Sequence, residues 1–213
     1  MLILRDALAR REAAHFAVNG GSTPRPVYER LRELIDDWSA VHLWWGDERC
    51  VPPDDDESNF LLAKQTLIDP LGLRADQVHR MRGELGPDEG AKAYGAELAE
   101  HLELNDEGIP VLDVVHLGLG PDGHTASLFP QHPALAVTGW ATVGVPDSPK
   151  PPPERISLSI ACLNAARQRV LHTVGEGKRD AVRATLADPS PATPASLLER
   201  RALEVIVDDA ANP

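Results

Sequence analysis

The stretch "VVHLGLGPDGHTASLFP", residues 114–130, is an apolar run that enters a glycine-rich turn. Its three glycines have the G-x-G-x-x-G spacing of a dinucleotide-binding loop. A loop of that kind must lead directly into a long helix, and an acidic residue should follow about 20 positions later. Here Pro130 and Pro133 leave room for about two helical turns, and no acidic residue stands at that distance. The context therefore argues against a nicotinamide enzyme.

The same turn carries two residues that can do acid–base chemistry. Asp122 and His124 follow the apolar run closely, at the carboxyl end of an expected strand. Open α/β sheets bind their ligands at that end of the strands. The glycines of the turn would then serve to bring His124 to a substrate. An ordinary exposed histidine in a structural turn is the alternative.

Short β-rich runs alternate with longer helical patterns, which indicates an α/β fold around a mostly parallel, Rossmann-like sheet. The apolar runs are nearly continuous, as expected for strands covered on both faces. They read "AHFAV", "AVHLWW", "LDVVHLGL", "WATVGV", "RISLSI", "QRVLHTV" and "LEVIVD". Helices are expected at about residues 24–38, 59–69, 87–104 and 177–187. The proline-rich segment 146–155 is expected to be a surface loop.

The segment "AVNGGSTPRPVYERL", residues 17–31, has the composition of a phosphate-binding loop. A strand would run into Gly20, Gly21, Ser22 and Thr23, and a helix would follow from Pro24. Such a turn directs free backbone N–H groups, two hydroxyls and a helix dipole at one place. The same residues also suit a plain capped helix start, because Ser and Thr are good N-caps and Gly-Gly is a common turn.

Charged and polar residues follow other strands too. The triplet Asp47-Glu48-Arg49 stands behind "VHLWW", and a guanidinium there could bind a phosphate or a carboxylate. Lys178 follows "QRVLHTV" at the start of an expected helix, where it either reaches a bound anion or is simply solvated. Ser58 and Asn59 either belong to the same site or cap the next helix. Because carboxyl ends of parallel strands share one edge, we expect these side chains to converge there.

The composition argues against several classes of protein. The chain of 213 residues has a net charge of −12, which disfavours sequence-independent nucleic-acid binding. Its two cysteines have no C-x-x-C spacing, which fits a reducing cytoplasm and no disulfide framework. The N-terminus lacks a signal-peptide pattern, and no run approaches 18 apolar residues. We therefore expect one soluble, cytoplasmic domain, residues 1–213, without membrane contact.

Other catalytic patterns are not found in the sequence. The eight histidines form no H-x-x-x-H or H-E-x-x-H array, and the acidic run 54–57 is not an EF-hand loop, so we expect no metal. Neither Ser22 nor Ser127 stands in a G-x-S-x-G elbow, which disfavours a serine hydrolase. The segment "HTVGEGKRD" does not fit a Walker loop.

Five separated motifs resemble, in order and spacing, those of the 6-phosphogluconolactonase family. They read "NGGSTPRPVYERL", "WWGDERCVPPDDDESNF", "LGLGPDGHTASLFP", "RISLSIACLNAARQRVLHTVGEGK" and "PASLL", and they cover about residues 16–207. The resemblance implies a three-layer α/β/α fold, shared with glucosamine-6-phosphate deaminase. It also implies hydrolysis of 6-phosphoglucono-1,5-lactone to 6-phosphogluconate in the oxidative pentose phosphate pathway, without metal or cofactor.

That reaction needs a base for the attacking water and positive groups for the developing oxyanion. We expect His124 to be the base, because a histidine with a pKa near 6.5 is largely neutral at pH 7–8, and Asp122 to orient it. The amides of residues 20–23 would hold the phosphate. The cations that would bind the phosphate or polarise the carbonyl, in an order left open, are Arg49, Arg155 and Lys178.

Three further expectations concern the choice between lactonase and deaminase, the N-terminal helix and the oligomeric state. The deaminase pattern continues G-H-I-A-F-N-E-P, and Phe129 stands where its Glu would be, which favours the lactonase. A deaminase-like sugar-phosphate enzyme and a non-catalytic sugar-phosphate-binding module are the alternatives. Asn19 replaces the Ser usual before Gly-Gly, and about 13 residues precede the first strand, so a shortened N-terminal helix is expected. We expect a monomer.

Overall fold

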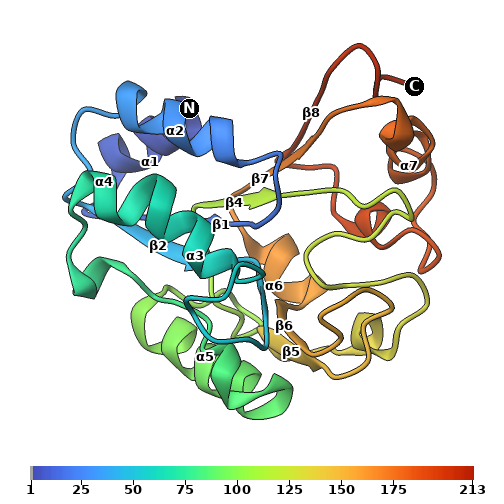
Figure 1. Cartoon of the computed structure of the whole chain (residues 1–213), viewed down its shortest axis with the longest axis horizontal. Coiled ribbons are helices and arrows are strands. Elements are labelled where there is room, and N and C mark those ends of the chain that lie inside the picture. Colours follow the sequence, from blue (N-terminus) through green and yellow to red (C-terminus); the bar gives the residue numbers. More distant parts are fainter. Residues whose placement is uncertain (1) are drawn as a thin grey trace.

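The structure is a computed structural model that describes residues 2–213. A five-stranded parallel sheet forms its centre, with strand order β2-β1-β4-β7-β8 (Figure 1). The bounds are β1 (Ala14–Val18), β2 (Val41–Trp45), β4 (Val114–Leu117), β7 (Gln168–Thr173) and β8 (Leu203–Val207). Because all pairings are parallel, the carboxyl ends of the five strands lie along one edge.

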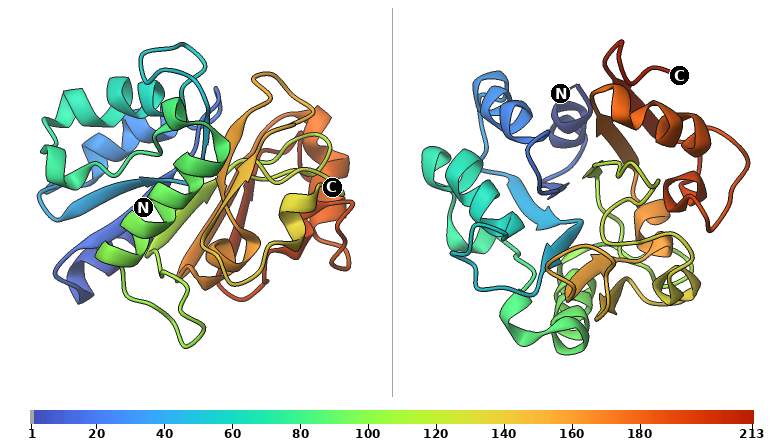
Figure 2. Two further views of the ribbon diagram at one scale, coloured as in Figure 1. Left: turned by 90° about the horizontal axis from the view of Figure 1, so that it is seen from below. Right: turned by 45° about the vertical axis from the view of Figure 1, so that its right-hand side comes forward.

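Helices cover both faces of this sheet. On one face lie α1 (Leu2–Arg10) and α2 (Arg25–Leu34), where Tyr28 packs edge-on against Phe16 of β1. On the other face α5 (Pro87–His101) packs its Tyr94 against Trp44 of β2, and the left view of Figure 2 shows α5 on the near side of the sheet. Phe16 pairs with the residue before Trp44, so these two side chains point to opposite faces. The expected three-layer α/β/α fold is confirmed.

A second, antiparallel sheet stands next to the carboxyl edge of the first. It consists of β3 (Asp47–Arg49), β6 (Arg155–Leu158) and β5 (Thr142–Val145), in the order β3-β6-β5. The runs expected at 140–145 and 155–160 are therefore strands, but they pair outside the parallel sheet. Gly46 joins the two sheets, because its N–H donates to Val18 O and its carbonyl accepts from Leu158 N. The chain thus continues from β2 into β3 and carries the next side chains beyond the edge.

The expected helices are present; three are shorter than expected, and the one that begins at Asn59 extends two residues further. Residues 59–71 form α3 (Asn59–Ala63), a π-helical turn (Lys64–Ile68) and α4 (Asp69–Leu71), and the last expected helix is α7 (Arg179–Thr185). The short α6 (Ile160–Ala165) was not expected, and Ser159 caps it by accepting from Cys162 N at 3.1 Å. The 3₁₀ turns span Ala75–Gln77, Gly83–Leu85, Pro133–Ala136, Glu176–Lys178 and Pro194–Leu197.

The connections after the strands bear on the candidate site. Residues 118–132, which follow β4, contain no helix, which agrees with the prediction that Pro130 and Pro133 exclude a long one. The proline-rich segment between β5 and β6 is a loop, also as expected. Among residues 2–213, no helix has the length and apolar character that crossing a bilayer requires.

Candidate active site

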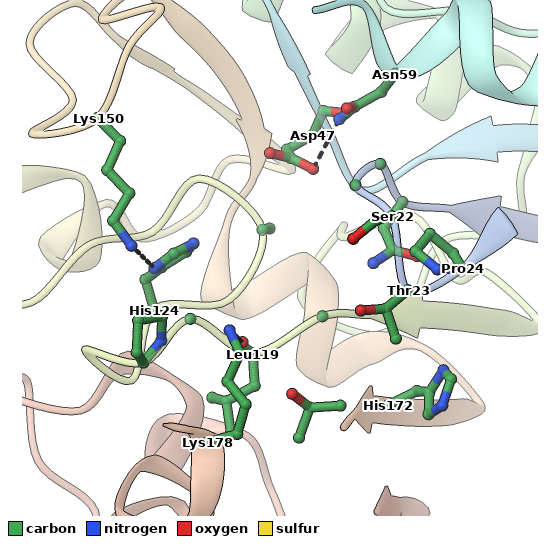
Figure 3. A pocket seen from close by; sticks show the side chains of 18 of the residues that line it. Ser22, Thr23, Pro24, Asp47, Asn59, Leu119, His124, Lys150, His172 and Lys178 are labelled. Atoms are coloured by element: carbon green, nitrogen blue, oxygen red, sulfur yellow. Dashed lines mark hydrogen bonds between the residues drawn. The ribbon is translucent and has the colours of Figure 1, made fainter. Parts of the chain in front are cut away.

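A cavity of about 300 Å³ opens at the carboxyl edge of the parallel sheet (Figure 3). Its wall is built by the loops after β1, β2, β4 and β7 together with the proline-rich loop. The structure brings together predicted residues that are distant in the sequence, namely Gly20, Gly21, Ser22, Thr23, Asp47, Arg49, Asn59, His124, Arg155 and Lys178. Strand ends of a parallel sheet thus converge as expected.

His124 and Asp122 form a hydrogen-bonded pair at one side of this cavity. Nδ1 of His124 lies 2.6 Å from Oδ1 of Asp122. Burial alone would raise the pKa of Asp122, but the hydrogen bond from His124 and the charge of Lys150 hold it at about 2. Burial lowers the pKa of His124, although Asp122 opposes this shift. The ionised Asp122 accepts the Nδ1–H, so Nε2 of the neutral ring is left as a proton acceptor.

The glycines of the turn make this pair possible by steric means. A Cβ atom on Gly120 would lie 1.9 Å from Nδ1 of His124 and 2.4 Å from Oδ1 of Asp122. Gly123 has φ of +83°, in the left-handed region that favours glycine. The G-x-G-x-x-G spacing therefore reflects a close approach of the histidine to its own turn.

The loop after β1 presents unused backbone donors to the cavity. The amides of residues 20–23 make no hydrogen bond to the described part of the chain, and the side chains of Ser22 and Thr23 also line the wall. A Cβ on Gly20 would lie 1.7 Å from Oδ1 of Asn59, so a larger residue there would displace the Asn59 side chain. Unpaired amides facing an open space form a good binding site for an anion.

Two of the predicted cations reach the cavity from different sides. Lys178 is half-buried, and its ammonium donates to the carbonyl of Leu119 at 2.6 Å. Arg49 bonds the carbonyl of Glu57 through Nη1, while its buried Nε has no partner among the described residues. Positive groups thus gather here in a chain of net charge −12, which favours a small anionic ligand at this place.

Most hydrogen bonds of Arg155 and Ser58 are made within the chain, although both residues were predicted to bind substrate. Arg155 lines the cavity, but its Nε and Nη2 donate to the carbonyls of residues 150–152 at 3.0–3.2 Å. Only its Nη1 makes no hydrogen bond within residues 2–213. Ser58 does not line the cavity: its Oγ donates to Glu48 at 3.0 Å and caps α3 by accepting from Leu61 N. The hydroxyl of Ser58 thus donates and accepts within the chain, and substrate binding by Ser58 stays a prediction.

Several residues of the site were not predicted. Lys150 of the proline-rich loop and His172 of β7 line the cavity (Figure 3). Thr173, the last residue of β7, lines it as well. The position of the last two at a strand end was a usable signal. Lys150 gave none, because nothing in a proline-rich segment shows which way a lysine points.

Glu48 is a buried positioning residue that strand periodicity could have revealed. In β3, Asp47 and Arg49 face the cavity, so Glu48 must face away from it. Its carboxylate accepts from the backbone N–H groups of Arg49, Asn59 and Phe60, each at 2.7 Å. Burial raises the pKa of Glu48 to about 7 against these hydrogen bonds. Asn59, held in this way, donates to Asp47 Oδ1 at 3.2 Å and ties the cavity wall to α3.

Replacing Glu48 by glutamine is expected to lower the free energy of unfolding by about 1–3 kcal/mol, because an amide NH₂ would face backbone donors that lose their acceptor. Denaturant unfolding at pH 8 measures this change. Glu100→Gln, at an exposed position of α5, is the matched control and should unfold as the unaltered protein does. Equal stability of the two variants would show that the Glu48 hydrogen bonds contribute nothing net.

With this geometry in place, comparison with known proteins defines the family. The sequence model described as "Glucosamine-6-phosphate isomerases/6-phosphogluconolactonase" matches residues 1–207. The chain belongs to this family. Among residues 2–213, the structure shows no group of three or more His, Cys, Asp or Glu side chains arranged to hold a metal ion.

Relatives within the family include proteins named 6-phosphogluconolactonase. The one from Streptomyces coelicolor is 42% identical over 193 residues, which are 85% of this chain and 74% of that protein. The one from Mycobacterium leprae is 41% identical over 202 residues, which are 91% of this chain and 81% of that protein.

Solved structures of the family superpose on nearly the whole chain. The 6-phosphogluconolactonase of Trypanosoma brucei has a TM-score of 0.86 at 30% identity and covers 99% of this chain and 89% of its own. The one from Thermotoga maritima has a TM-score of 0.85 at 26% identity and covers 97% and 89%. A monomeric glucosamine-6-phosphate deaminase, at 18% identity and a TM-score of 0.77, covers 99% and 92% and shares the fold.

Proposed function

We propose that this chain hydrolyses 6-phosphoglucono-1,5-lactone to 6-phosphogluconate, the second step of the oxidative pentose phosphate pathway. The observation that carries the proposal is the pairing of His124 with Asp122 across a cavity from the free amides of residues 20–23. One wall thus offers a proton acceptor, and the other offers an anion site. The names of the relatives at 42% and 41% identity support the same reaction.

The reaction follows from the proton acceptor at Nε2. His124 takes a proton from a water molecule as the water oxygen bonds to C1 of the lactone, and the carbonyl oxygen becomes an oxyanion. When the carbonyl re-forms, the bond from C1 to the ring oxygen breaks, and the imidazolium returns its proton to that oxygen. Asp122 stabilises the imidazolium in between. General-base catalysis of this kind contributes about 10²–10⁴-fold to the rate.

The cations divide between the two ends of the substrate. We assign the phosphate to the loop of residues 20–23 and to Lys178, because the amides and the ammonium converge on the same cavity. We assign the oxyanion to Arg155, since its guanidinium lies 5.6 Å above the ring of Phe129, and that ring lies 4.7 Å from the imidazole of His124. Arg49 and Asn59 complete the wall beside the sugar hydroxyls.

The environment of His124 favours a lactonase over a deaminase. Phe129 is buried and packs against the imidazole, at the position where the deaminase pattern has its glutamate. No second carboxylate is therefore available there to assist sugar ring opening. A non-catalytic binding module has no use for a histidine that is oriented by an ionised aspartate.

We propose three further properties of this enzyme, which are its oligomeric state, its compartment and the absence of nucleic-acid binding. We also propose that the chain acts as a single-domain monomer. The free thiols of Cys50 and Cys162 support a reducing cytoplasm. The net charge of −12 supports an enzyme that does not bind nucleic acid.

The decisive experiment is acid release from freshly generated 6-phosphogluconolactone, with the spontaneous rate subtracted. We expect saturable hydrolysis by the purified protein and no ammonia from glucosamine 6-phosphate. Ammonia release without lactone hydrolysis would favour the deaminase, and ligand binding without either reaction would favour a binding module.

Replacing Lys178 by methionine is expected to raise KM for the phosphorylated lactone about tenfold or more and to change kcat little, because a charge-assisted contact to the phosphate is lost. Steady-state kinetics at pH 7.5 measure this. Lys92→Met, at an exposed position of α5, removes the same charge far from the cavity and should leave KM unchanged. A fall in kcat at constant KM would remove Lys178 from the phosphate site.

A further inference from the structure

Lys150 of the proline-rich loop contacts the His124–Asp122 pair, and Figure 3 shows its ammonium next to the ring of His124. Its Nζ lies 3.2 Å from Oδ1 of Asp122 and 3.2 Å from Nδ1 of His124. The side chain also lines the cavity and is 37% exposed. The turn after β4 builds the His124–Asp122 pair by itself, and the proline-rich loop adds a positive charge next to it.

The backbone of Lys150 is held firmly in this place. Its N–H donates to Ser148 Oγ at 3.2 Å, and its carbonyl accepts from the same hydroxyl at 3.0 Å. Arg155, which is only 5% exposed, donates to the carbonyls of Lys150, Pro151 and Pro152. The anchored backbone keeps the Cα of Lys150 in a place from which its ammonium reaches Asp122.

Hydrogen positions within the three groups follow from the distances. The contact of 2.6 Å between His124 and Asp122 requires one proton, which lies on Nδ1 because the carboxylate is ionised. Asp122 Oδ1 then accepts from Lys150 as well. The approach of Nζ to Nδ1 is consequently a contact between two donors, which places a full positive charge beside the imidazole. A second proton, at Nε2, would give the ring a positive charge next to that of Lys150, which is electrostatically unfavourable.

We propose, building on the lactonase function above, that Lys150 is a positioning residue for the catalytic base. It fixes Asp122 as the acceptor of Nδ1–H, and its charge keeps Nε2 of His124 free of a proton in the empty site. The other charged groups around the ring are Asp122 and Asp47, which favour a protonated ring, and Arg155 and Lys178, which line the same cavity. Lys150 is the cation in hydrogen-bond distance, and it lowers the pKa of His124 beyond the effect of burial.

Replacing Lys150 by methionine tests this role through the pH dependence of kcat/KM between pH 5 and 9. The rate follows the fraction of His124 without a proton, so removing the charge raises the pKa of His124 and moves the acidic limb to higher pH. We expect a shift of about one pH unit, the effect of a unit charge at 3–4 Å even through water. Lys150→Arg should restore the original limb, and Lys92→Met should leave it unchanged.

A second measurement reads the same effect without any reaction. Proton NMR titration of the His124 ring, assigned with the His124→Gln variant, should show the same upward shift in Lys150→Met. The substrate phosphate titrates near pH 6 in all variants, so differences between them belong to the enzyme.

Three outcomes would separate the possibilities. An unchanged acidic limb together with an unchanged NMR titration would overturn the proposal. A fall of kcat/KM by the same factor at every pH, without rescue by arginine, would reveal a purely structural role and overturn it as well. Absence of lactone hydrolysis by the unaltered enzyme would contradict the proposed function alone, because the NMR titration still decides what Lys150 does.

Discussion

Replacing His124 by glutamine is expected to reduce kcat for the lactone by about 10²–10⁴-fold, which corresponds to about 3–5 kcal/mol of transition-state stabilisation. Glutamine keeps a polar side chain of similar reach but cannot accept the proton of the attacking water. KM should change by a few-fold at most, because the anion site lies on the opposite wall. Initial rates of acid release, corrected for spontaneous hydrolysis, measure the loss.

His132→Gln is the matched control for this variant. His132 also pairs with an aspartate, at 2.8 Å from Asp147, but it does not line the cavity. Its replacement should leave kcat unchanged, whereas the His124 variant should remain folded with a normal denaturation midpoint. Near-normal turnover in a folded His124 variant would remove the histidine from the mechanism, even if the protein still hydrolysed lactones.

Replacing Gly120 by alanine is expected to lower kcat about 10²-fold or more. The added methyl group would occupy the space of His124 Nδ1, at 1.9 Å, and of Asp122 Oδ1, at 2.4 Å. The imidazole must move by an ångström or more, and a misplacement of that size is enough for such a loss. Kinetics combined with thermal unfolding separate the displaced base from a general loss of structure.

Gly177→Ala provides the comparison, because a Cβ at that position meets nothing within 4 Å. It should keep both kcat and the unfolding temperature of the unaltered enzyme. Full activity of the Gly120 variant would mean that the turn tolerates a side chain, and that the observed contact between the glycine and the catalytic pair is not required.

The sequence was sufficient to predict the parts of this site that local rules control. A run of apolar residues followed by glycine and polar residues marks the carboxyl end of a buried strand, and parallel strands share that end. The loop of residues 20–23 and the turn with His124 were placed correctly for this reason. The prolines at 130 and 133 likewise excluded a long helix after β4, and the structure has none there.

The remaining parts depend on pairings between distant residues. Nothing in "RISLSI" shows that this run pairs with residues 47–49, and nothing in "WATVGV" shows that it pairs with "RISLSI" instead of joining the parallel sheet. Arg155 lines the cavity as expected, but the hydrogen bonds that hold it there go to its own loop, which only the folded backbone reveals. The contact of Lys150 with His124 spans 26 positions and depends on that same loop. A single sequence carries no periodic signal for contacts of this kind.

The proposed catalytic pair and the proposed anion site come from different parts of the chain. Asp122 and His124 are two residues apart in one turn, so an insertion elsewhere leaves their mutual geometry untouched. The proposed anion site comes from a loop near residue 20 and from a lysine near residue 178. A change in these two distant loops, by natural variation or engineering, could therefore alter which anionic group of a substrate is recognised. The geometry of the His124–Asp122 pair would stay the same.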